Sequence, residues 1–263
     1  MPDDDRLRKR ATFDEIAELY ATGRPPYPQV VIDDVVELGG FARGSRLVEI
    51  GCGTGQATAA LAERGLDITC VELGLRLAEV ARRELARFTS VRVVNADIEH
   101  WRPEAGAYDG VAAFLAFHWV DPERRYELAA ALLRPGGALA VVSAHHVMPP
   151  GADPFYFDVQ EDYRAVGMAG DEPPPPPEKI VYLDGEIEAS GLFGPVTVRR
   201  REWEVVDTAD EHIALINTYS PHLLLPEEQR RELFERIRRR IEARLGGTVR
   251  KSMLAIVQVA RRR

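Results

Sequence analysis

Glycines and acidic side chains gather in one short stretch of the sequence, VEIGCGTGQAT at residues 48–58. Gly51, Gly53 and Gly55 follow one another at intervals of two residues, and Glu49 precedes the first of them. Glycine loses more conformational entropy on folding than other residues, so this cluster indicates a backbone that something must approach closely. Bare backbone N–H groups at the start of a helix bind polar and anionic ligands. The stretch therefore predicts a ligand-binding loop.

The spacing of the glycines distinguishes two classes of cofactor. A dinucleotide fingerprint reads G-x-G-x-x-G, with the third glycine five positions after the first, whereas here it comes four positions after. A carboxylate at Glu49 would repel a pyrophosphate but would suit the ammonium and sulfonium charges of S-adenosylmethionine (SAM). Glu72 lies 21 residues after Gly51, where an acidic side chain binds the ribose hydroxyls of either cofactor. The combination favours SAM, with an NAD-dependent oxidoreductase as the alternative.

Alternating strands and helices must position these residues. Strand, helix and strand with short connections predict parallel pairing through right-handed crossovers. Near-continuous apolar strands fit a sheet that is covered on both faces, so we expect a doubly wound α/β sheet. The expected strands are 45–50, 67–72, 91–95, 108–115 and 138–143, with helices at 54–64, 75–88 and from Asp121 to about Leu133.

The second half of the chain departs from this alternation. Five consecutive prolines at 173–177 predict a stiff polyproline II connector. The last two strands are expected to pair as an antiparallel edge hairpin, which gives a mostly parallel, seven-stranded, Rossmann-like sheet. The expected elements are a helix near 178–190, a strand at 196–206, a helix pair over 208–245 and a strand at 253–260.

Three parts of the chain follow from this pattern. Residues 1–143 are expected to hold N-terminal helices and the cofactor-binding core. Residues 144–177 form an insertion, and residues 178–263 complete the sheet. The insertion and the segment 207–245 are expected to form a helical lid, lined by aromatic side chains of the insertion.

Composition narrows the class of protein. The chain has 263 residues, of which 45% are hydrophobic and 29% charged, as in an ordinary globular protein. The net charge of −8 argues against a nucleic-acid partner. Cys52 and Cys70 form no disulfide framework and lack zinc-site spacing, so we expect no metal and a reducing, cytoplasmic location. No apolar run predicts a membrane span, and residues 1–10 predict a solvated tail rather than a signal segment.

The sequence resembles the class I SAM-dependent methyltransferases from about Phe13 onward. Five segments follow the order of the family's motifs, and AELYATGRPPYP at 17–28 is similar to small-molecule enzymes of the trans-aconitate methyltransferase type. The five segments are VEIGCGTG (48–55), VELG (71–74), NADIE (95–99), YDGVAAFLAFHWVD (108–121) and LRPGGALAVVS (133–143).

The resemblance implies SAM as the cofactor, S-adenosylhomocysteine as the product, and a cofactor role for each matching position. Arg24 also has the alternative interpretation of a surface turn residue, since two prolines follow it. The implied residues are Glu49, Gly51, Gly53 and Gly55 for the methionine end and the sulfonium, Glu72 and Leu73 for the ribose and adenine, Asp97 and Ile98 for the adenine edge, Phe114 and Ala116 at the exit of the fourth strand, and Tyr20 and Arg24 over the methionine carboxylate.

The methyl acceptor is the open question. The segment AFLAFHWVD lacks the Asn/Asp-Pro-Pro-aromatic tetrad of enzymes that methylate the exocyclic amines of bases. A hydroxyl acceptor needs a general base, whereas a carboxylate is already ionised. The candidate bases are His118, which has the alternative of packing against Trp119, and His145 and His146 after the fifth strand. The candidate substrate-binding residues are His146, Tyr219, His222 and Arg250.

We therefore expect a SAM-dependent methyltransferase that acts on a small molecule as a monomer or homodimer, without a nucleic-acid or membrane partner. The resemblance makes O-methylation of a carboxylate the first expectation. O-methylation of a hydroxyl or phenol with a histidine base is the alternative. A non-catalytic SAM-binding regulator would keep the same loop and Glu72, so it stays open as well.

Overall fold

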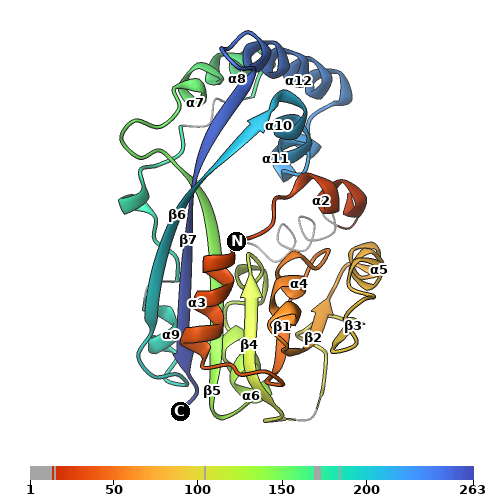
Figure 1. Ribbon diagram of the computed structural model, residues 1–263, viewed down its shortest axis with the longest axis vertical. Helices are drawn as coiled ribbons and strands as arrows, with labels where there is room; N and C mark the ends of the chain where they lie inside the picture. The colour runs from red at the N-terminus through yellow and green to blue at the C-terminus, as the bar shows by residue number, and fades with distance from the viewer. Residues whose placement is uncertain (1–13, 15, 104, 169–172, 184) are drawn as a thin grey trace.

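The computed structural model describes residues 14, 16–103, 105–168, 173–183 and 185–263 (Figure 1). Seven strands form one sheet in the order β3-β2-β1-β4-β5-β7-β6. β1 to β5 are parallel to one another, and β7 runs antiparallel to both β5 and β6. The expected doubly wound sheet with its antiparallel edge is confirmed, whereas the predicted solvated tail lies outside the described residues. The strands are β1 Arg46–Ile50, β2 Asp67–Glu72, β3 Val91–Asn95, β4 Tyr108–Phe114, β5 Leu133–Val147, β6 Thr197–Thr208 and β7 Thr248–Arg261.

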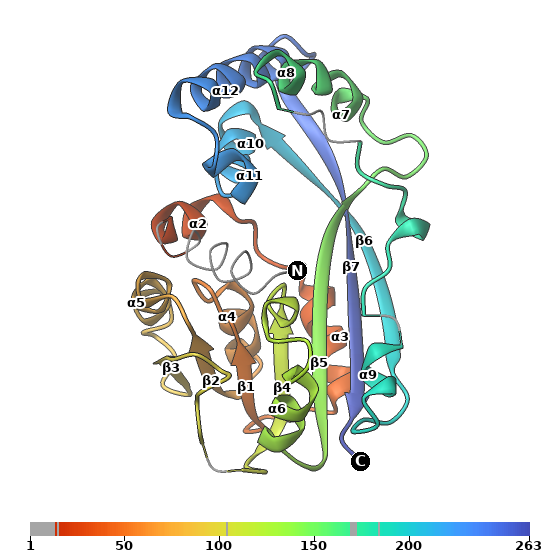
Figure 2. The same cartoon turned by 180° about the vertical axis from the view of Figure 1, so that it is seen from behind.

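Helices cover both faces of this sheet because its strands are apolar on both sides. Successive residues of a strand point to opposite faces, and Leu47 and Val48 of β1 accordingly belong to two different buried clusters. α3 (Gln29–Gly39), α4 (Gln56–Glu63) and α5 (Leu75–Glu84) contribute to the first cluster. α6 (Arg125–Leu132) and α9 (Glu186–Ala189) contribute to the second, and α6 lies in front of the sheet when the molecule is seen from behind (Figure 2).

An ion-pair cluster fastens α3 to the edge strand β6. Asp34 is 2% exposed, and its carboxylate accepts hydrogen bonds from Arg199 at 2.6 Å and from Arg201 at 2.6 and 2.8 Å. Hydrogen bonds from Arg201 and Arg199 hold the pKa of Asp34 below its ordinary value. The acidic helix residue and the arginines are therefore a coupled unit that joins the first helix layer to the far edge of the sheet.

Several predicted boundaries are wrong, each for a local reason. The helix expected from Asp121 starts at Arg125, because residues 122–124 form a turn first. The helix expected near 178–190 is reduced to a 3-10 turn, η2 (Pro177–Lys179), and to α9. Gly185 has a φ of +73° directly before α9, so a continuous helix cannot pass through it.

The strands on the antiparallel side are longer than expected. β5 continues to Val147 because β7 gives it a partner beyond the end of β4, with His145 opposite Leu254 and His146 opposite Met253. β7 begins at Thr248 rather than at 253, because its charged start pairs with β6 in a continuous register. The proline run lies beside these strands, where Pro175 accepts a hydrogen bond from the backbone N–H of Met148.

Five helices, which we call the cap, pack where β5 and β6 end and where β7 begins (Figure 1). They have their own buried cluster, which includes Phe155, Leu233, Ile237 and Ile241. The last of these helices ends at Glu242, and Leu245 beyond its end is fully exposed. The cap helices are α7 Phe155–Asp158, α8 Gln160–Ala165, α10 Ala209–Ile216, α11 Ser220–Leu223 and α12 Glu227–Glu242.

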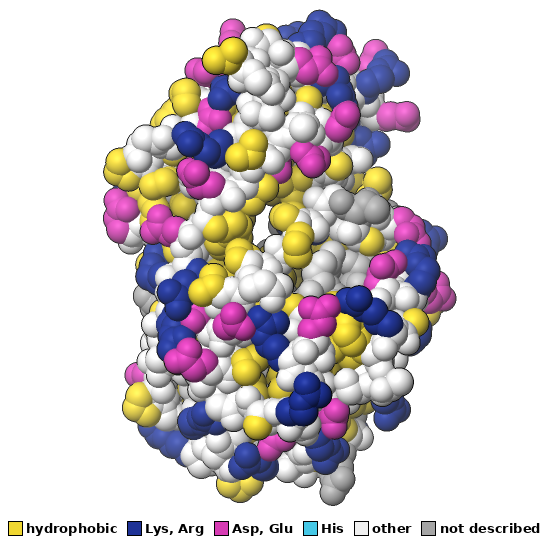
Figure 3. Space-filling view, in the orientation of Figure 1, with side chains coloured by type: hydrophobic (Ala, Val, Ile, Leu, Met, Phe, Trp, Pro, Cys, Tyr) yellow, Lys and Arg dark blue, Asp and Glu magenta, His cyan; other side chains and the backbone are white. Residues whose placement is uncertain are grey.

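The helix α2 (Ala17–Gly23) lies between the cap and the sheet (Figure 1). It contacts α10 of the cap and α5 beside the sheet. Figure 3 shows a hollow between the cap and the lower body of the molecule, with hydrophobic side chains gathered around it. None of the helices built from described residues has both the length and the apolar character of a membrane span.

Candidate cofactor and acceptor site

The glycine loop joins the carboxyl end of β1 to the start of α4. Gly51, Gly53 and Gly55 all have positive φ angles, of +65°, +57° and +96°, a conformation that costs other residues steric strain. A Cβ atom on Gly51 would lie 2.7 Å from the Cβ atom of Ala116, just after β4. A side chain is therefore excluded at Gly51 by the backbone conformation and by the close approach of the β4 exit.

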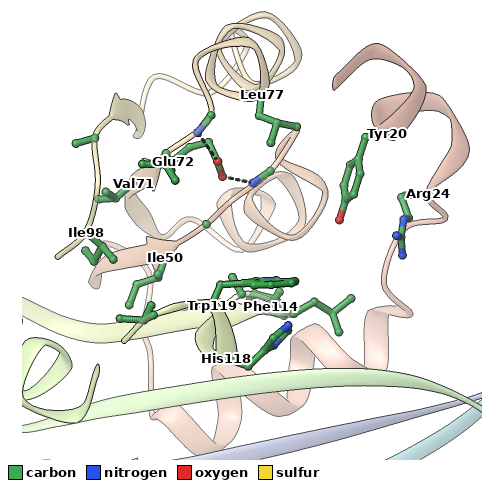
Figure 4. Close-up of a pocket in the computed structure, with 18 residues that line it drawn as sticks. Tyr20, Arg24, Ile50, Val71, Glu72, Leu77, Ile98, Phe114, His118 and Trp119 are labelled. Carbon is green, nitrogen blue, oxygen red and sulfur yellow. Dashed lines mark hydrogen bonds between the residues drawn. The ribbon is translucent and has the colours of Figure 1, made fainter. Parts of the chain in front are cut away.

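Glu72 connects this loop to the next crossover. It ends β2 and is 6% exposed, and its carboxylate accepts hydrogen bonds from the backbone N–H groups of Gly53 and Gly74, each at 2.9 Å (Figure 4). Hydrogen bonds to a carboxylate are stronger than those between neutral groups. Glu72 thereby holds the glycine loop and the start of α5 in a fixed relation.

A first cavity of about 260 Å³ lies at the carboxyl ends of β1, β2 and β4. β1 lies between β2 and β4 in the sheet, which is the position where ligands bind in open parallel sheets. Glu72 and the loop form one side, and apolar side chains face them (Figure 4). Its walls include Ile50, Val71, Leu73, Leu77, Ile98, Phe114, Trp119 and Val120.

Two predicted cofactor residues lie beside this cavity rather than in its wall. Ala96 and Ile98 line it, but Asp97 between them accepts a hydrogen bond from the N–H of Glu99 at 3.0 Å and lies 3.2 Å from His100 Nδ1. A Cβ atom on Gly55 would lie 2.8 Å from Leu85 Cδ1, so this glycine lets α4 pack closely against the α5 end.

A second cavity of about 370 Å³ adjoins the first. Glu49 lines it, is 1% exposed, and accepts a hydrogen bond of 2.7 Å from the Thr58 hydroxyl. Burial raises the pKa of Glu49 to about 7, so a cation beside it would favour its ionised form. The two cavities share Tyr20, Arg24, Gly51, Gly53, Phe114 and Leu115 in their walls.

Arg24 follows α2 and lies between two aromatic rings at the junction of the cavities. Its guanidinium carbon is 5.0 Å from the ring centre of Tyr20 and 4.8 Å from that of Tyr219. Figure 4 shows Tyr20 and Arg24 together on the side of the first cavity opposite Ile98. The Nε atom of Arg24 is buried and has no hydrogen-bond partner among the described residues. Such a partly unpaired guanidinium is suited to a carboxylate ligand.

Leu115 has the unusual backbone of this junction. Its φ is +55°, which is strained for a bulky side chain and recurs at functional sites. This turn ends β4 and sets Leu115 in the walls of both cavities. A positive φ at this position could not be predicted, because the residue is not a glycine.

The three candidate bases occupy different environments. His118 lines the first cavity with its ring 4.8 Å from that of Trp119, and burial lowers its pKa to about 4. His145 is bonded to the Ser143 hydroxyl at 2.8 Å, lines neither cavity, and has a pKa lowered by burial. His146 lines the second cavity, and burial lowers its pKa to about 3. With these pKa values, His118 and His146 are neutral at pH 7 and are weak bases.

Only some of the predicted substrate residues meet at the second cavity. Tyr219 and His146 line it. His222 is buried in the cap, where its Nε2 atom lies 3.0 Å from the Tyr163 hydroxyl. Arg250 is exposed, and its Nε atom lies 3.5 Å from a carboxylate oxygen of Glu204. The structure thus separates His222 and Arg250 from the cavity.

Lys251, the residue after Arg250, lies in the cavity wall although the sequence pattern did not indicate it. β7 includes both Arg250 and Lys251, and neighbouring residues of a strand point to opposite faces. Arg250 is therefore exposed, whereas Lys251 lines the second cavity. A strand start placed at 248 rather than 253 would have revealed it. Other lining residues without a sequence signal are Ala144, Trp203, Leu215 and Met253.

This arrangement fits the parts of SAM. The Glu72 carboxylate suits ribose hydroxyls, the apolar walls of the first cavity suit a flat base, and Arg24 suits the carboxylate of the methionine end. Glu49 suits a neighbouring cation, because a cation would favour the ionised form of this buried carboxyl group.

Comparison with known proteins agrees with this geometry. Residues 48–141 match the family model described as "Methyltransferase domain". An uncharacterized methyltransferase of Mycobacterium tuberculosis is 34% identical over 131 residues, which are 50% of this chain and 51% of that protein. The ubiquinone biosynthesis O-methyltransferase of Bordetella avium is 33% identical over 106 residues, which are 39% of this chain and 44% of that protein. The chain thus spans about half the length, or less, of these relatives.

A solved structure described as a putative type II methyltransferase from Anaeromyxobacter dehalogenans shares the fold. It has a TM-score of 0.64 at 23% identity and covers 90% of this chain and 97% of its own. The chain therefore shares its fold with a solved methyltransferase structure, and residues 48–141 match a methyltransferase domain. These findings support the predicted class I SAM-dependent methyltransferase, and the narrower resemblance to trans-aconitate methyltransferase stays a prediction.

Proposed function

We propose that the protein transfers a methyl group from SAM to the carboxylate of a small molecule. The observation that carries the proposal is the pair of adjoining cavities, which meet at Gly51, Gly53 and Leu115. One holds the groups that suit a nucleoside, and the other offers a separate space at the same junction. When bound, SAM supplies a methyl group on a sulfonium, which an acceptor lone pair takes as the sulfur leaves as a neutral thioether.

The roles of the protein's own residues follow from their positions. Glu72 holds the ribose and keeps the glycine loop in place, Arg24 pairs with the methionine carboxylate, and Glu49 lies near the ammonium. Phe114 and Leu115 separate the nucleoside from the acceptor and exclude water between them. Holding the two reactants in line is worth about 7–11 kcal/mol in favourable cases.

The preference for a carboxylate acceptor rests on the histidines and the charges. A base whose pKa is about 3 or 4 does not efficiently remove a proton from a hydroxyl at neutral pH, and this applies to His146 and His118. A carboxylate is ionised already and needs no base. With Arg24 engaged by the methionine carboxylate, Lys251 supplies positive charge to the second cavity. O-methylation is the activity in the name of the Bordetella avium relative, which fits a carboxylate and a hydroxyl acceptor equally.

A hydroxyl or phenol acceptor is the second candidate. One observation favours it: the Nε2 atom of His146 is buried and has no hydrogen-bond partner among the described residues, although the histidine lines the second cavity. A bound hydroxyl would supply that partner.

Calorimetric titration of the purified protein with S-adenosylhomocysteine, and separately with NAD, tests the cofactor. We expect micromolar binding of S-adenosylhomocysteine alone, and then transfer of labelled methyl from SAM to acids in an acceptor screen. Binding of NAD alone would overturn the proposal and favour hydride transfer. Binding of S-adenosylhomocysteine without transfer to any small molecule would favour the non-catalytic regulator.

A further inference from the structure

Lys251 is a buried lysine in a chain that uses arginine for almost all its positive charge. It is one of three lysines, with Lys9 and Lys179. Its side chain is 3% exposed and lies in the wall of the second cavity. Burying an ammonium is costly unless it is paired and hydrogen-bonded. The position therefore needs an explanation in terms of partners.

Asp207 on β6 satisfies only part of that need. Its Oδ2 atom lies 3.4 Å from Lys251 Nζ, which is long for a charge-assisted hydrogen bond. An ammonium has three N–H donors, and Asp207 is its one hydrogen-bond partner among the described residues. The same carboxylate oxygen lies 3.7 Å from His212 Nδ1, so Asp207 is shared between two neighbours.

Further polar atoms around this pair are left without partners. His146 Nε2, Tyr156 Oη and His212 Nδ1 are buried and have no hydrogen-bond partner within the described part of the chain. The rings of His146 and Tyr156 are in edge-on contact, with centres 4.1 Å apart. Unsatisfied buried polar atoms are rare in folded proteins. Of these three residues His146 lines the second cavity, so a polar ligand group there would supply the missing partner of its Nε2 atom.

Much of the rest of the second cavity is apolar and aromatic, and Glu49 and Gln56 are also in its wall. Tyr27, Trp203 and Met253 lie in its wall, together with Leu215. Two cations, Lys251 and Arg24, line the same space. Flat apolar walls with a positive charge suit a molecule that has a hydrophobic body and one anionic group.

We propose that Lys251 binds the carboxylate of the methyl acceptor, with His146 as a second hydrogen-bonding group. The acceptor is a carboxylic acid with a flat, apolar body that lies against Trp203 and Tyr27. A carboxylate has two oxygens, so one can be held by Lys251 while the other receives the methyl group. This assignment of acceptor class rests on the proposed function of methyl transfer, but the binding of the acid can be measured by itself.

The experiment is calorimetric titration of the full chain with benzoate and trans-cinnamate, against their neutral amides and phenyl phosphate, with and without saturating S-adenosylhomocysteine. The variants are Lys251→Met, the matched exposed control Lys179→Met, and the double variant Lys251→Met with Asp207→Asn. The wild type and Lys179→Met should bind an acid at least about 10-fold more tightly than its amide. Lys251→Met should abolish this preference and leave the affinity for S-adenosylhomocysteine unchanged.

The double variant covers a possible folding defect, because it also removes the carboxylate that Lys251→Met would leave unpaired; it should likewise bind acid and amide equally. A preference for the acid that survives in Lys251→Met or in the double variant overturns the proposal. So does equal binding of acid and amide by the wild type, or a preference for phenyl phosphate. Lys251-dependent acid binding without any binding of S-adenosylhomocysteine would support the acid site and refute methyl transfer, which separates the two failures.

Discussion

Replacing Glu72 with glutamine tests the centre of the cofactor site. The carboxylate accepts one hydrogen bond of 2.9 Å from Gly53 N–H and one from Gly74 N–H. An amide has one acceptor oxygen, so one of these N–H groups loses its partner and meets an NH₂ group instead. Glutamine also offers the ribose hydroxyls a neutral group in place of a charged acceptor, and a hydrogen bond to a charged group is worth about 1.5–3 kcal/mol. We therefore expect the affinity for S-adenosylhomocysteine to fall about 10- to 150-fold.

The assay is calorimetric titration with S-adenosylhomocysteine, with circular dichroism to establish that the variant is folded. The matched control is Glu63→Gln, because that glutamate is about half exposed and its ion pair is with a surface arginine, Arg87, at 2.7 Å. Its affinity should stay within about twofold of the wild type, since exposed ion pairs contribute little. A folded Glu72→Gln protein with wild-type affinity would refute the assigned role of Glu72.

Three further perturbations test the loop, the helix layer and the acceptor chemistry. Gly44→Ala should lower the free energy of unfolding by about 1–2 kcal/mol because of its φ of +82° alone. Gly51→Ala should lower it more and weaken S-adenosylhomocysteine binding, because its Cβ atom would lie 2.7 Å from that of Ala116. Equal effects of the two substitutions on stability and binding would contradict the role of Gly51. Asp34→Asn should lower the unfolding free energy by about 1–3 kcal/mol at pH 7 in urea titration, since the arginines it leaves are partly exposed. The lowered pKa of Asp34 gives the wild type stability that is fully present above pH ~3.8 and lost as the pH falls through the folded pKa; an unchanged acid transition in the variant would be evidence against the coupling. His118→Ala should spare methyl transfer to a carboxylate, because His118 lines the first cavity and its low pKa makes it an inefficient base; loss of label transfer from SAM to a carboxylic acid would mean that the histidine positions the cofactor.

Much of the cofactor side of the molecule could be predicted from the sequence. β1, β2 and β3 were predicted to within a residue, because short apolar runs between turn residues report buried parallel strands directly. The glycine loop and Glu72 could be placed together in advance, because consecutive parallel strands end at the same edge of a sheet. These features depend on residues close together in the sequence, and local patterns carry them.

The acceptor side could not be predicted in the same way. Its cavity takes residues from α2, β4, β5, β6, β7 and the cap, and their meeting depends on how far the antiparallel strands extend beyond the parallel ones. An error of five residues in the start of β7 hid Lys251 and suggested Arg250 instead. Because side chains alternate along a strand, the exposed residue and the cavity residue are direct neighbours in the sequence.

The sequence by itself determined the sheet, the loop and the acidic residue that faces it, because each is encoded by periodicity or spacing over a few residues. The tertiary structure alone decided three things: that Ala116 excludes a side chain at Gly51, that Arg24 lies between Tyr20 and Tyr219, and that Lys251 faces a cavity. Gly51 and Ala116 are 65 residues apart and Arg24 and Tyr219 are 195 residues apart, whereas the position of Lys251 depends on which face of a long strand it occupies. The energies of these contacts come from packing and burial, which no local pattern in the chain records.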